Sequence, residues 1–293
     1  MNPWTRARLG LSNRTRRLFP NRRFRQSVQG VALTLPWSHR LPDYAKTYPG
    51  YGQNLVALAK AIGVAEFPAR FSVIDVGANV GDSALQILNV VDVDVVCVDG
   101  DPYWLPFLRD NTAREPRVRI VHSMLLPSTE NGVGGFTARR AGGTTRFVPG
   151  GGARTTPTTT AESLRAALPG IAPIRLIKSD TDGFDVRLVP DLAHVYADSQ
   201  PVLFFEFDPP LARETGDPDP ERIWGELIEL GYDQCVVWNN FGELLGSWST
   251  AELPLVATIL DLSTEERGYH YWDVAAIHQN DRHSDAIRQA VCT

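Results

Sequence analysis

Short apolar runs alternate with helical segments through the middle of this 293-residue chain, and that alternation limits the fold more than any other feature. The expected strands lie at 71–77, 93–100, 118–123, 173–180 and 201–208, with two later ones at 234–240 and 271–278. Strands that alternate with helices through short links form a parallel sheet with helices on both faces. The sequence therefore predicts an α/β domain built on a mostly parallel, seven-stranded sheet.

The remaining segments are arranged around that domain. We expect a basic arm at 1–34 that is flexible or bound to a partner, a helical lead-in or cap at 35–65, the α/β domain at 66–280 and a tail at 281–293. Segment 125–157, which is rich in Gly, Thr and Arg, cannot form a helix, so short hairpins or a mobile excursion are expected there. Loops of this length are often functional.

The composition is that of an ordinary globular protein, with 43% hydrophobic and 22% charged residues. No apolar stretch reaches the roughly 18 residues that a membrane helix needs. The three cysteines, Cys97, Cys235 and Cys292, lack the spacing of a metal site or a disulfide framework. A reducing cytoplasm is therefore the expected location.

Positive charge is concentrated near the N-terminus. Residues 1–42 carry nine arginines and no acidic residue, whereas the whole chain has a net charge of −5. The first 27 residues lack the apolar core of a secretory signal. Such a segment can be a poorly ordered arm, can rest on anionic lipid or an acidic substrate, or can act as a targeting sequence. Peripheral contact with an anionic membrane is one expectation, and nucleic-acid binding is not expected.

A glycine loop follows the first predicted strand. Gly77, Asn79 and Gly81 form the pattern G-x-N-x-G after Asp75. A strand–loop–helix junction exposes backbone N–H groups and lets a ligand approach the main chain closely. Asparagine tolerates the left-handed conformation, so the tight turn is retained, but the spacing differs from the G-x-G-x-x-G of dinucleotide enzymes.

The second predicted strand ends at Asp99, which Gly100 follows. An acidic residue at that tip is placed to accept both hydroxyls of a ribose, although a surface turn is the simpler alternative. The glycine loop and this acid, without dinucleotide spacing, indicate a ribose-bearing cofactor that lacks a pyrophosphate. S-adenosylmethionine (SAM) is the obvious candidate.

Five blocks of the sequence, VIDVGANVGD, CVDGDP, TTTAESL, LIKSDTDGFD and LFFEFDP, resemble in order those of the FkbM-type SAM-dependent methyltransferases. The resemblance covers residues 35–210, and the first and fourth blocks together are its specific part. It implies a Rossmann-like class I methyltransferase fold and methyl transfer to oxygen, commonly on sugars or complex natural products.

The resemblance also implies roles for individual residues. Asp75, Gly77, Asn79 and Gly81 would hold the methionine end of SAM, Asp99 with Gly100 beside it would take the ribose, and His122, Ser123 and Met124 would flank the adenine. The fourth block departs from the common IKIDVEGHE, because Ser179, Asp182 and Phe184 replace Ile, Glu and His. Loss of that histidine rules out histidine-based catalysis at this position.

Charged residues gather where the fourth and fifth strands end. Lys178, Asp180 and Asp182 come from the fourth strand, and Glu206 comes from the fifth. A base that takes the acceptor's proton adds about 10²–10⁴-fold to the rate. We expect Asp180 or Asp182 to be that base, with Lys178 as counter-charge and as a donor to the substrate or Glu206. The site is predicted to need no metal; a divalent ion on the carboxylates, or helix capping, are the alternatives.

The expected activity is SAM-dependent O-methylation of a hydroxyl on a sugar in a glycan, glycolipid or glycosylated natural product. The basic arm, segment 125–157 and the aromatic segment near the C-terminus suggest a polar glycan or glycolipid as acceptor, either neutral or anionic. Two other classes stay open. One is a glycosyltransferase that uses Asp180–Thr181–Asp182 as a metal-binding D-x-D motif, and the other is a non-catalytic protein that binds SAM or glycan as a scaffold.

Overall fold

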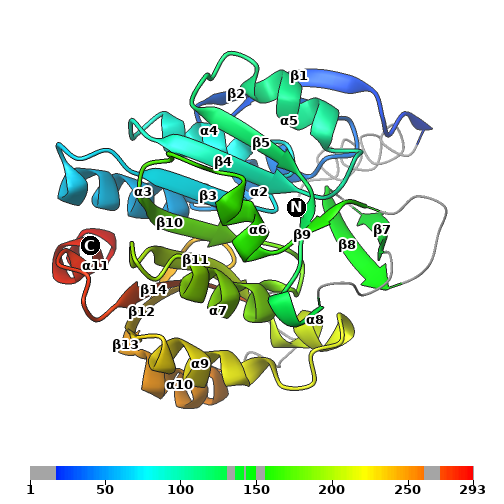
Figure 1. Ribbon diagram of the computed structural model, residues 1–293. Coiled ribbons are helices and arrows are strands. Elements are labelled where there is room, and N and C mark those ends of the chain that lie inside the picture. Colours follow the sequence, from blue (N-terminus) through cyan, green and yellow to red (C-terminus); the bar gives the residue numbers. More distant parts are fainter. Residues whose placement is uncertain (1–17, 131–135, 142, 150–155, 261–270, 293) are drawn as a thin grey trace.

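A computed structural model describes residues 18–130, 136–141, 143–149, 156–260 and 271–292 of the chain (Figure 1). Its centre is an eight-stranded sheet with the order β13-β12-β14-β11-β10-β3-β4-β5. The strands are β3 Ser72–Val76, β4 Asp94–Asp99, β5 Val118–His122, β10 Ile174–Ser179, β11 Val202–Phe207, β12 Tyr232–Asn239, β13 Leu244–Ser249 and β14 Trp272–His278.

Five neighbouring strands, β5, β4, β3, β10 and β11, are parallel, and the three that follow pair antiparallel. This Rossmann-like arrangement confirms the predicted α/β fold and its mostly parallel sheet. The sheet has one strand more than expected, because the chain turns back after β12 through Gly242 and adds β13 at the edge. The turn residue has a φ of +81°, a conformation that glycine adopts without strain.

Helices cover both faces of the sheet, as predicted. Helices α3 Gln53–Glu66, α4 Asp82–Leu88, α5 Leu105–Thr112 and α11 Ser284–Val291 pack on one face, and α6 Ala161–Ala166, α7 Asp185–Val195, α9 Ile223–Glu229 and α10 Leu253–Ile259 on the other. In β3 the neighbouring side chains of Val73 and Ile74 enter these two different clusters. Every residue of β3 is buried, as expected for a parallel strand covered on both sides.

The N-terminal region corrects one prediction. Residues 23–36, assigned to the basic arm and the start of the lead-in, form an antiparallel hairpin of β1 Arg23–Val28 and β2 Val31–Pro36. The alternating residues Val31, Leu33 and Leu35 are buried and pack against Trp104 and Phe107. This burial orders a segment whose arginines alone suggested an arm. Residues 1–17 lie outside the described residues.

Two helices follow, α2 Leu41–Thr47 and α3, where the helical lead-in was expected. Segment 125–157 holds a hairpin of β7 Phe136–Ala141 and β8 Thr144–Pro149, while Met124–Leu125 (β6) pairs with Thr158–Thr159 (β9). The expected hairpin is therefore present; residues 131–135, 142 and 150–155 lie outside the described residues.

The remaining short elements are helix α8 Pro209–Glu214 and three 3₁₀ turns, at Ser128–Glu130, Pro220–Arg222 and Thr250–Glu252. The predicted C-terminal tail is mostly helix α11, whose Ile287 is buried in the cluster that contains α3. None of the helices in the described part of the chain is long and apolar enough to cross a bilayer.

Candidate functional site

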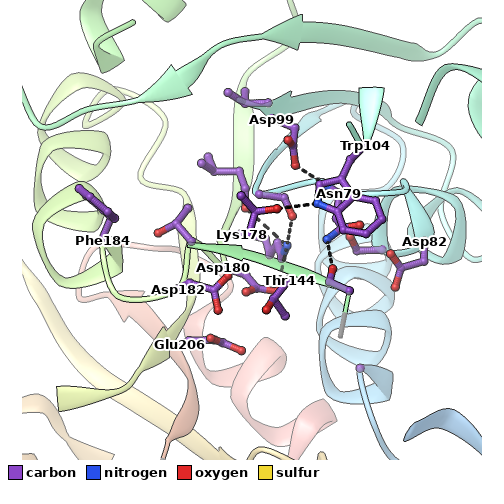
Figure 2. Close-up of a pocket in the computed structure, with 18 of the residues that line it drawn as sticks. Asn79, Asp82, Asp99, Trp104, Thr144, Lys178, Asp180, Asp182, Phe184 and Glu206 are labelled. Atoms are coloured by element: carbon purple, nitrogen blue, oxygen red, sulfur yellow. Dashed lines mark hydrogen bonds and ion pairs between the residues drawn. The ribbon is translucent and has the colours of Figure 1, made fainter. Parts of the chain in front are cut away.

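A cavity opens at the carboxyl ends of the parallel strands, where open α/β sheets bind ligands (Figure 2). Its walls come from the glycine loop after β3 and from the ends of β4, β10 and β11. Three further segments close it: the start of β14, residues 39–55 around α2 and the start of α3, and the β7–β8 hairpin. Segments from both ends of the chain therefore meet around the sheet edge.

The glycine loop adopts the geometry that its sequence suggested. Asn79 has a φ of +49°, which confirms the predicted left-handed turn. Gly77 has a φ of +75°, and a Cβ there would lie 1.9 Å from the carbonyl oxygen of Asp180. Glycine is required at that position because the loop after β3 touches the loop after β10. Gly77 and Asn79 both line the cavity.

Asp99 lies at the tip of β4 and faces the same cavity. Its carboxylate accepts hydrogen bonds from the backbone N–H groups of Asn79, at 2.7 Å, and Asp101, at 2.8 Å. An ionised carboxylate offers about four acceptor positions, so about two remain for ligand hydroxyls. Burial raises the pKa of Asp99 to about 7, and this effect outweighs the two backbone hydrogen bonds, which lower it.

Three more of the predicted cofactor residues line the cavity beside Asp99, namely Gly100, Ser123 and Met124. A Cβ on Gly100 would lie 2.8 Å from the Met124 Cβ, so glycine lets the short strand β6 approach. The backbone N–H of Ser123 donates to the Asp99 carbonyl at 3.0 Å. His122, by contrast, ends β5 and is not on the cavity wall.

Asp75 and Gly81 are not among the residues that line the cavity, so their contact with the methionine end of SAM stays a prediction. Asp75 is fully buried, accepts a hydrogen bond from Ser83 Oγ at 2.7 Å and lies 3.1 Å from Lys178 Nζ. Gly81 has a φ of +83°, and a Cβ there would lie 2.8 Å from Leu108 of α5. Both residues therefore support the glycine loop: Asp75 pairs with Lys178, and Gly81 lets the loop pack closely against α5.

Lys178 connects the two loops. Its Nζ lies 3.1 Å from Asp75 and 3.4 Å from Asp180, and it donates to the Gly77 carbonyl at 3.1 Å. Burial alone would lower the pKa of Lys178, but Asp75 and Asp180 outweigh burial and raise it well above its ordinary value. The ammonium is therefore charged and already engaged by the protein. Lys178 is thus the predicted counter-charge to Asp180, and its ammonium also donates to the backbone of the glycine loop.

The three aspartates of the fourth block have different places. Asp185 is buried and accepts from Ser179 Oγ at 2.6 Å and Thr181 Oγ1 at 2.8 Å, so it fixes the loop. Asp180 and Asp182 line the cavity. Asp182 has a left-handed φ of +52°, and burial together with Asp180 raises its pKa to about 7.

Phe184 occupies the position of the missing histidine. Its ring is buried, meets Phe136 edge-on at 6.0 Å between centroids, and forms part of the cavity wall. The position therefore contributes apolar surface and no acid or base, as expected from the sequence.

Glu206 also lines the cavity, and its pKa is raised well above its ordinary range by burial and then by Asp180 and Asp273. Within the described residues, no group of three or more His, Cys, Asp or Glu is placed to hold a metal ion. The geometry thus gives no support to the alternative of a metal on Asp180, Asp182 and Glu206.

Sequence reasoning missed Asp82, which directly follows the glycine loop, and several residues from distant segments. The distant residues are His39, Tyr51, Asn54, Trp104, Thr145, Tyr271 and Asp273. Asp273 carried a detectable signal, because it is a lone acid inside the otherwise apolar predicted strand 271–278. The others carried none, since their role depends on which segments meet at the cavity.

Asn79 also ties the glycine loop to the hairpin above it. Its side-chain N–H donates to the Gly143 carbonyl at 2.6 Å, and its side-chain oxygen lies 3.4 Å from His39 Nε2. Trp104 Nε1 donates to Thr145 Oγ1 at 2.7 Å. These bonds join the β7–β8 hairpin to the part of the cavity wall that Asn79 and Trp104 form.

Comparisons with known proteins give only a distant likeness. No model of a protein family matches the sequence, and no curated protein matches it. Many solved structures are similar in fold. They include an O-methyltransferase from Bacillus cereus in complex with SAH, at 13% identity over 77% of this chain and 80% of that chain, with a TM-score of 0.43.

Two others are a precorrin-6y C5,15-methyltransferase from Geobacter metallireducens and a fibrillarin pre-rRNA processing protein from Methanococcus jannaschii. The first has 13% identity over 77% of this chain and 87% of that chain, with a TM-score of 0.40. The second has 10% identity over 71% of this chain and 67% of that chain, with a TM-score of 0.42. At this distance the function has to be argued from the cavity itself.

Proposed function

We propose that this protein is a SAM-dependent methyltransferase that acts on an oxygen atom of its acceptor. The observation that carries the proposal is the bond between the glycine loop and Asp99. The Asn79 N–H holds the Asp99 carboxylate at 2.7 Å, at the carboxyl end of the second parallel strand, where a ribose is bound in folds of this type. The same loop exposes its backbone to the cavity, and its glycines do not have the G-x-G-x-x-G spacing of dinucleotide-binding enzymes.

The cofactor, when bound, supplies an electrophilic methyl group. The chain's own contribution is to align the acceptor oxygen with it and to take that oxygen's proton. Asp182 fits the proton-accepting role, because a pKa of about 7 leaves it partly ionised at neutral pH. Asp180, 3.4 Å from Lys178, is held ready to orient the acceptor hydroxyl.

The acceptor class follows from the resemblance to FkbM-type methyltransferases and is part of this proposal: a sugar hydroxyl in a glycan, glycolipid or glycosylated natural product. A cytoplasmic location, with contact to anionic membrane through the Arg-rich N-terminus, belongs to the same proposal. The D-x-D alternative has less support, since Asp180 pairs with Lys178.

Calorimetric titration with SAH and with UDP-glucose tests the cofactor. We expect SAH to bind in the micromolar range and UDP-glucose not to bind. Asp99→Ala should weaken SAH binding at least about tenfold, as expected for loss of charge-assisted hydrogen bonds. Asp94→Ala, at the opposite end of β4, should leave the affinity unchanged. Equal SAH affinity in the Asp99→Ala variant would refute the assignment.

A second measurement tests the catalytic carboxylates. Asp180→Asn and Asp182→Asn should each keep the SAH affinity of the wild type while methyl transfer to the acceptor slows by about 10²–10⁴-fold for the residue that is the base. Wild-type turnover in both variants would show that neither residue is the base.

A further inference from the structure

The cavity has far more acidic than basic groups. Six acidic residues line it, and Lys178 is the only lysine or arginine among the described lining residues. Lys178 is already engaged by Asp75 and Asp180. His39 adds no positive charge, because burial lowers its pKa to about 4. Several carboxylates therefore face the cavity without a cation from the protein. The acidic lining residues are Asp82, Asp99, Asp180, Asp182, Glu206 and Asp273.

Two of these acids face each other directly. Glu206 of β11 and Asp273 of β14 are cross-strand partners in the antiparallel pair. Side chains in such positions are about 4.5–5.5 Å apart at Cβ, and like charges there are destabilising. Asn54 donates one hydrogen bond to Asp273, at 2.7 Å. For Glu206, no hydrogen bond or ion pair joins its side chain to the described residues, and Figure 2 shows it projecting beside Asp180 and Asp182.

This acid pair lies on the acceptor side of the cavity. Neighbouring strands are about 4.8 Å apart, so β11 and β14 lie about 14 Å and 19 Å across the sheet from β4, which carries Asp99. Glu206 and Asp273 therefore lie at the end of the cavity away from Asp99, which is the end left for the acceptor when a ribose is held at Asp99.

Aromatic rings stand beside the pair. Tyr51 and Tyr271 line the cavity, and Glu206 and Asp273 are among the charges that act on both hydroxyls. Tyr44 also lines the cavity, with its ring 5.7 Å from that of Tyr51. Carboxylates combined with tyrosine faces are the groups that bind an ammonium ion, through charge-assisted hydrogen bonds and cation–π contact.

We infer that the acceptor carries a protonated amine, which binds between Glu206 and Asp273 beside Tyr51 and Tyr271. The ammonium allows the two facing carboxyl groups to be ionised together and orients the acceptor, while methylation takes place at a hydroxyl near Asp180 and Asp182. An anionic acceptor, which the basic N-terminus suggested, would meet like charge at this wall. The inference rests on the proposed methyltransferase function and defines its substrate class as an amine-bearing sugar or similar compound.

The test compares glucosamine, glucose and glucuronate as probes, each titrated into the SAH-saturated full-length protein and followed by ligand-observed NMR. Glucosamine should bind at least about tenfold more tightly than glucose, the size expected for a charge-assisted hydrogen bond, and glucuronate should bind more weakly than either. The double variant Glu206→Gln/Asp273→Asn should reduce the preference for glucosamine to less than about twofold while SAH affinity stays unchanged.

Glu229→Gln, an exposed substitution on α9, is the matched control and should retain the full preference. The inference is overturned if glucosamine binds no better than glucose, fails to bind at all, or keeps its advantage in the double variant. These outcomes are distinct from failure of the proposed function, which would appear first as absence of SAH binding to the wild-type protein.

Discussion

The backbone N–H of Asn79 donates to the Asp99 carboxylate at 2.7 Å, and this bond joins the glycine loop to the tip of the neighbouring strand. Asn79 can do so because its left-handed φ of +49° turns the N–H toward β4. The bond fixes the carboxylate before any ligand arrives. Because the Asp99 carboxylate is already oriented, it loses little conformational freedom when a ligand binds.

The pKa of about 7 at Asp99 makes cofactor affinity depend on pH. Ribose hydroxyls would donate to the ionised carboxylate, so binding favours the deprotonated form and weakens as pH falls through 7. The dissociation constant for SAH should be about tenfold higher at pH 6 than at pH 8, since one proton must be released. Calorimetry across this range measures the change. The Asp99→Asn variant should bind SAH weakly at every pH and show no change in affinity between pH 6 and pH 8. A wild-type dissociation constant that does not change over this range would contradict the prediction.

Gly77→Ala should abolish SAH binding and destabilise the protein. The added Cβ would lie 1.9 Å from the Asp180 carbonyl oxygen, so the two loops would have to separate. Gly170→Ala is the matched control, because Gly170 also has a positive φ, of +71°, but nothing lies within 4 Å of its Cβ. The control should lose about 1–2 kcal/mol of stability from backbone strain alone and keep its SAH affinity. Thermal denaturation and titration together separate the two effects, and equal behaviour of the two variants would disprove the steric argument.

Lys178→Met should lower the free energy of unfolding by about 3–5 kcal/mol, because removal of one partner leaves Asp75 buried without its counter-charge. Lys60→Met, on the exposed side of α3, should change stability by less than about 0.5 kcal/mol. Urea denaturation at pH 7 gives both values. A Lys178 variant as stable as the wild type would mean that Asp75 is accommodated without the ammonium.

The raised carboxyl pKa values also predict how stability depends on pH. Burial and mutual repulsion raise the pKa of Asp182 and of Asp273 to about 7, and that of Glu206 well above its ordinary value. The folded state then binds more protons than the unfolded state, so stability is lost as pH rises from about 5 to 8. Glu206→Gln, which mimics the protonated form, should raise the melting temperature at pH 8 and leave it nearly unchanged at pH 5. A lower melting temperature for this variant at pH 8 would mean that the ionised carboxylate is stabilising.

Some site features could be predicted because they depend on neighbours close in sequence. The turn at Asn79 follows from its own residue type and the flanking glycines, and the position of Asp99 follows from the end of an apolar strand. The place of Asp75 could not be read from its neighbours in sequence. It is buried, accepts a hydrogen bond from Ser83 and pairs with Lys178, and it is not among the residues that line the cavity.

The parallel sheet, the glycine loop, the acid at the tip of the second strand and the charged end of the fourth strand could all be predicted from the sequence. Periodicity and turn chemistry are local, so a single chain displays them. Which carboxylates face the cavity and which bind other protein groups depends on the packing of the whole domain: Asp182 lines the cavity, whereas Asp185 accepts a hydrogen bond from Ser179. That packing also brought together Asn54 and Asp273, which are 219 residues apart in the chain and share a 2.7 Å hydrogen bond. Such contacts depend on how helices and antiparallel strands pack around the sheet edge, and no local pattern encodes them.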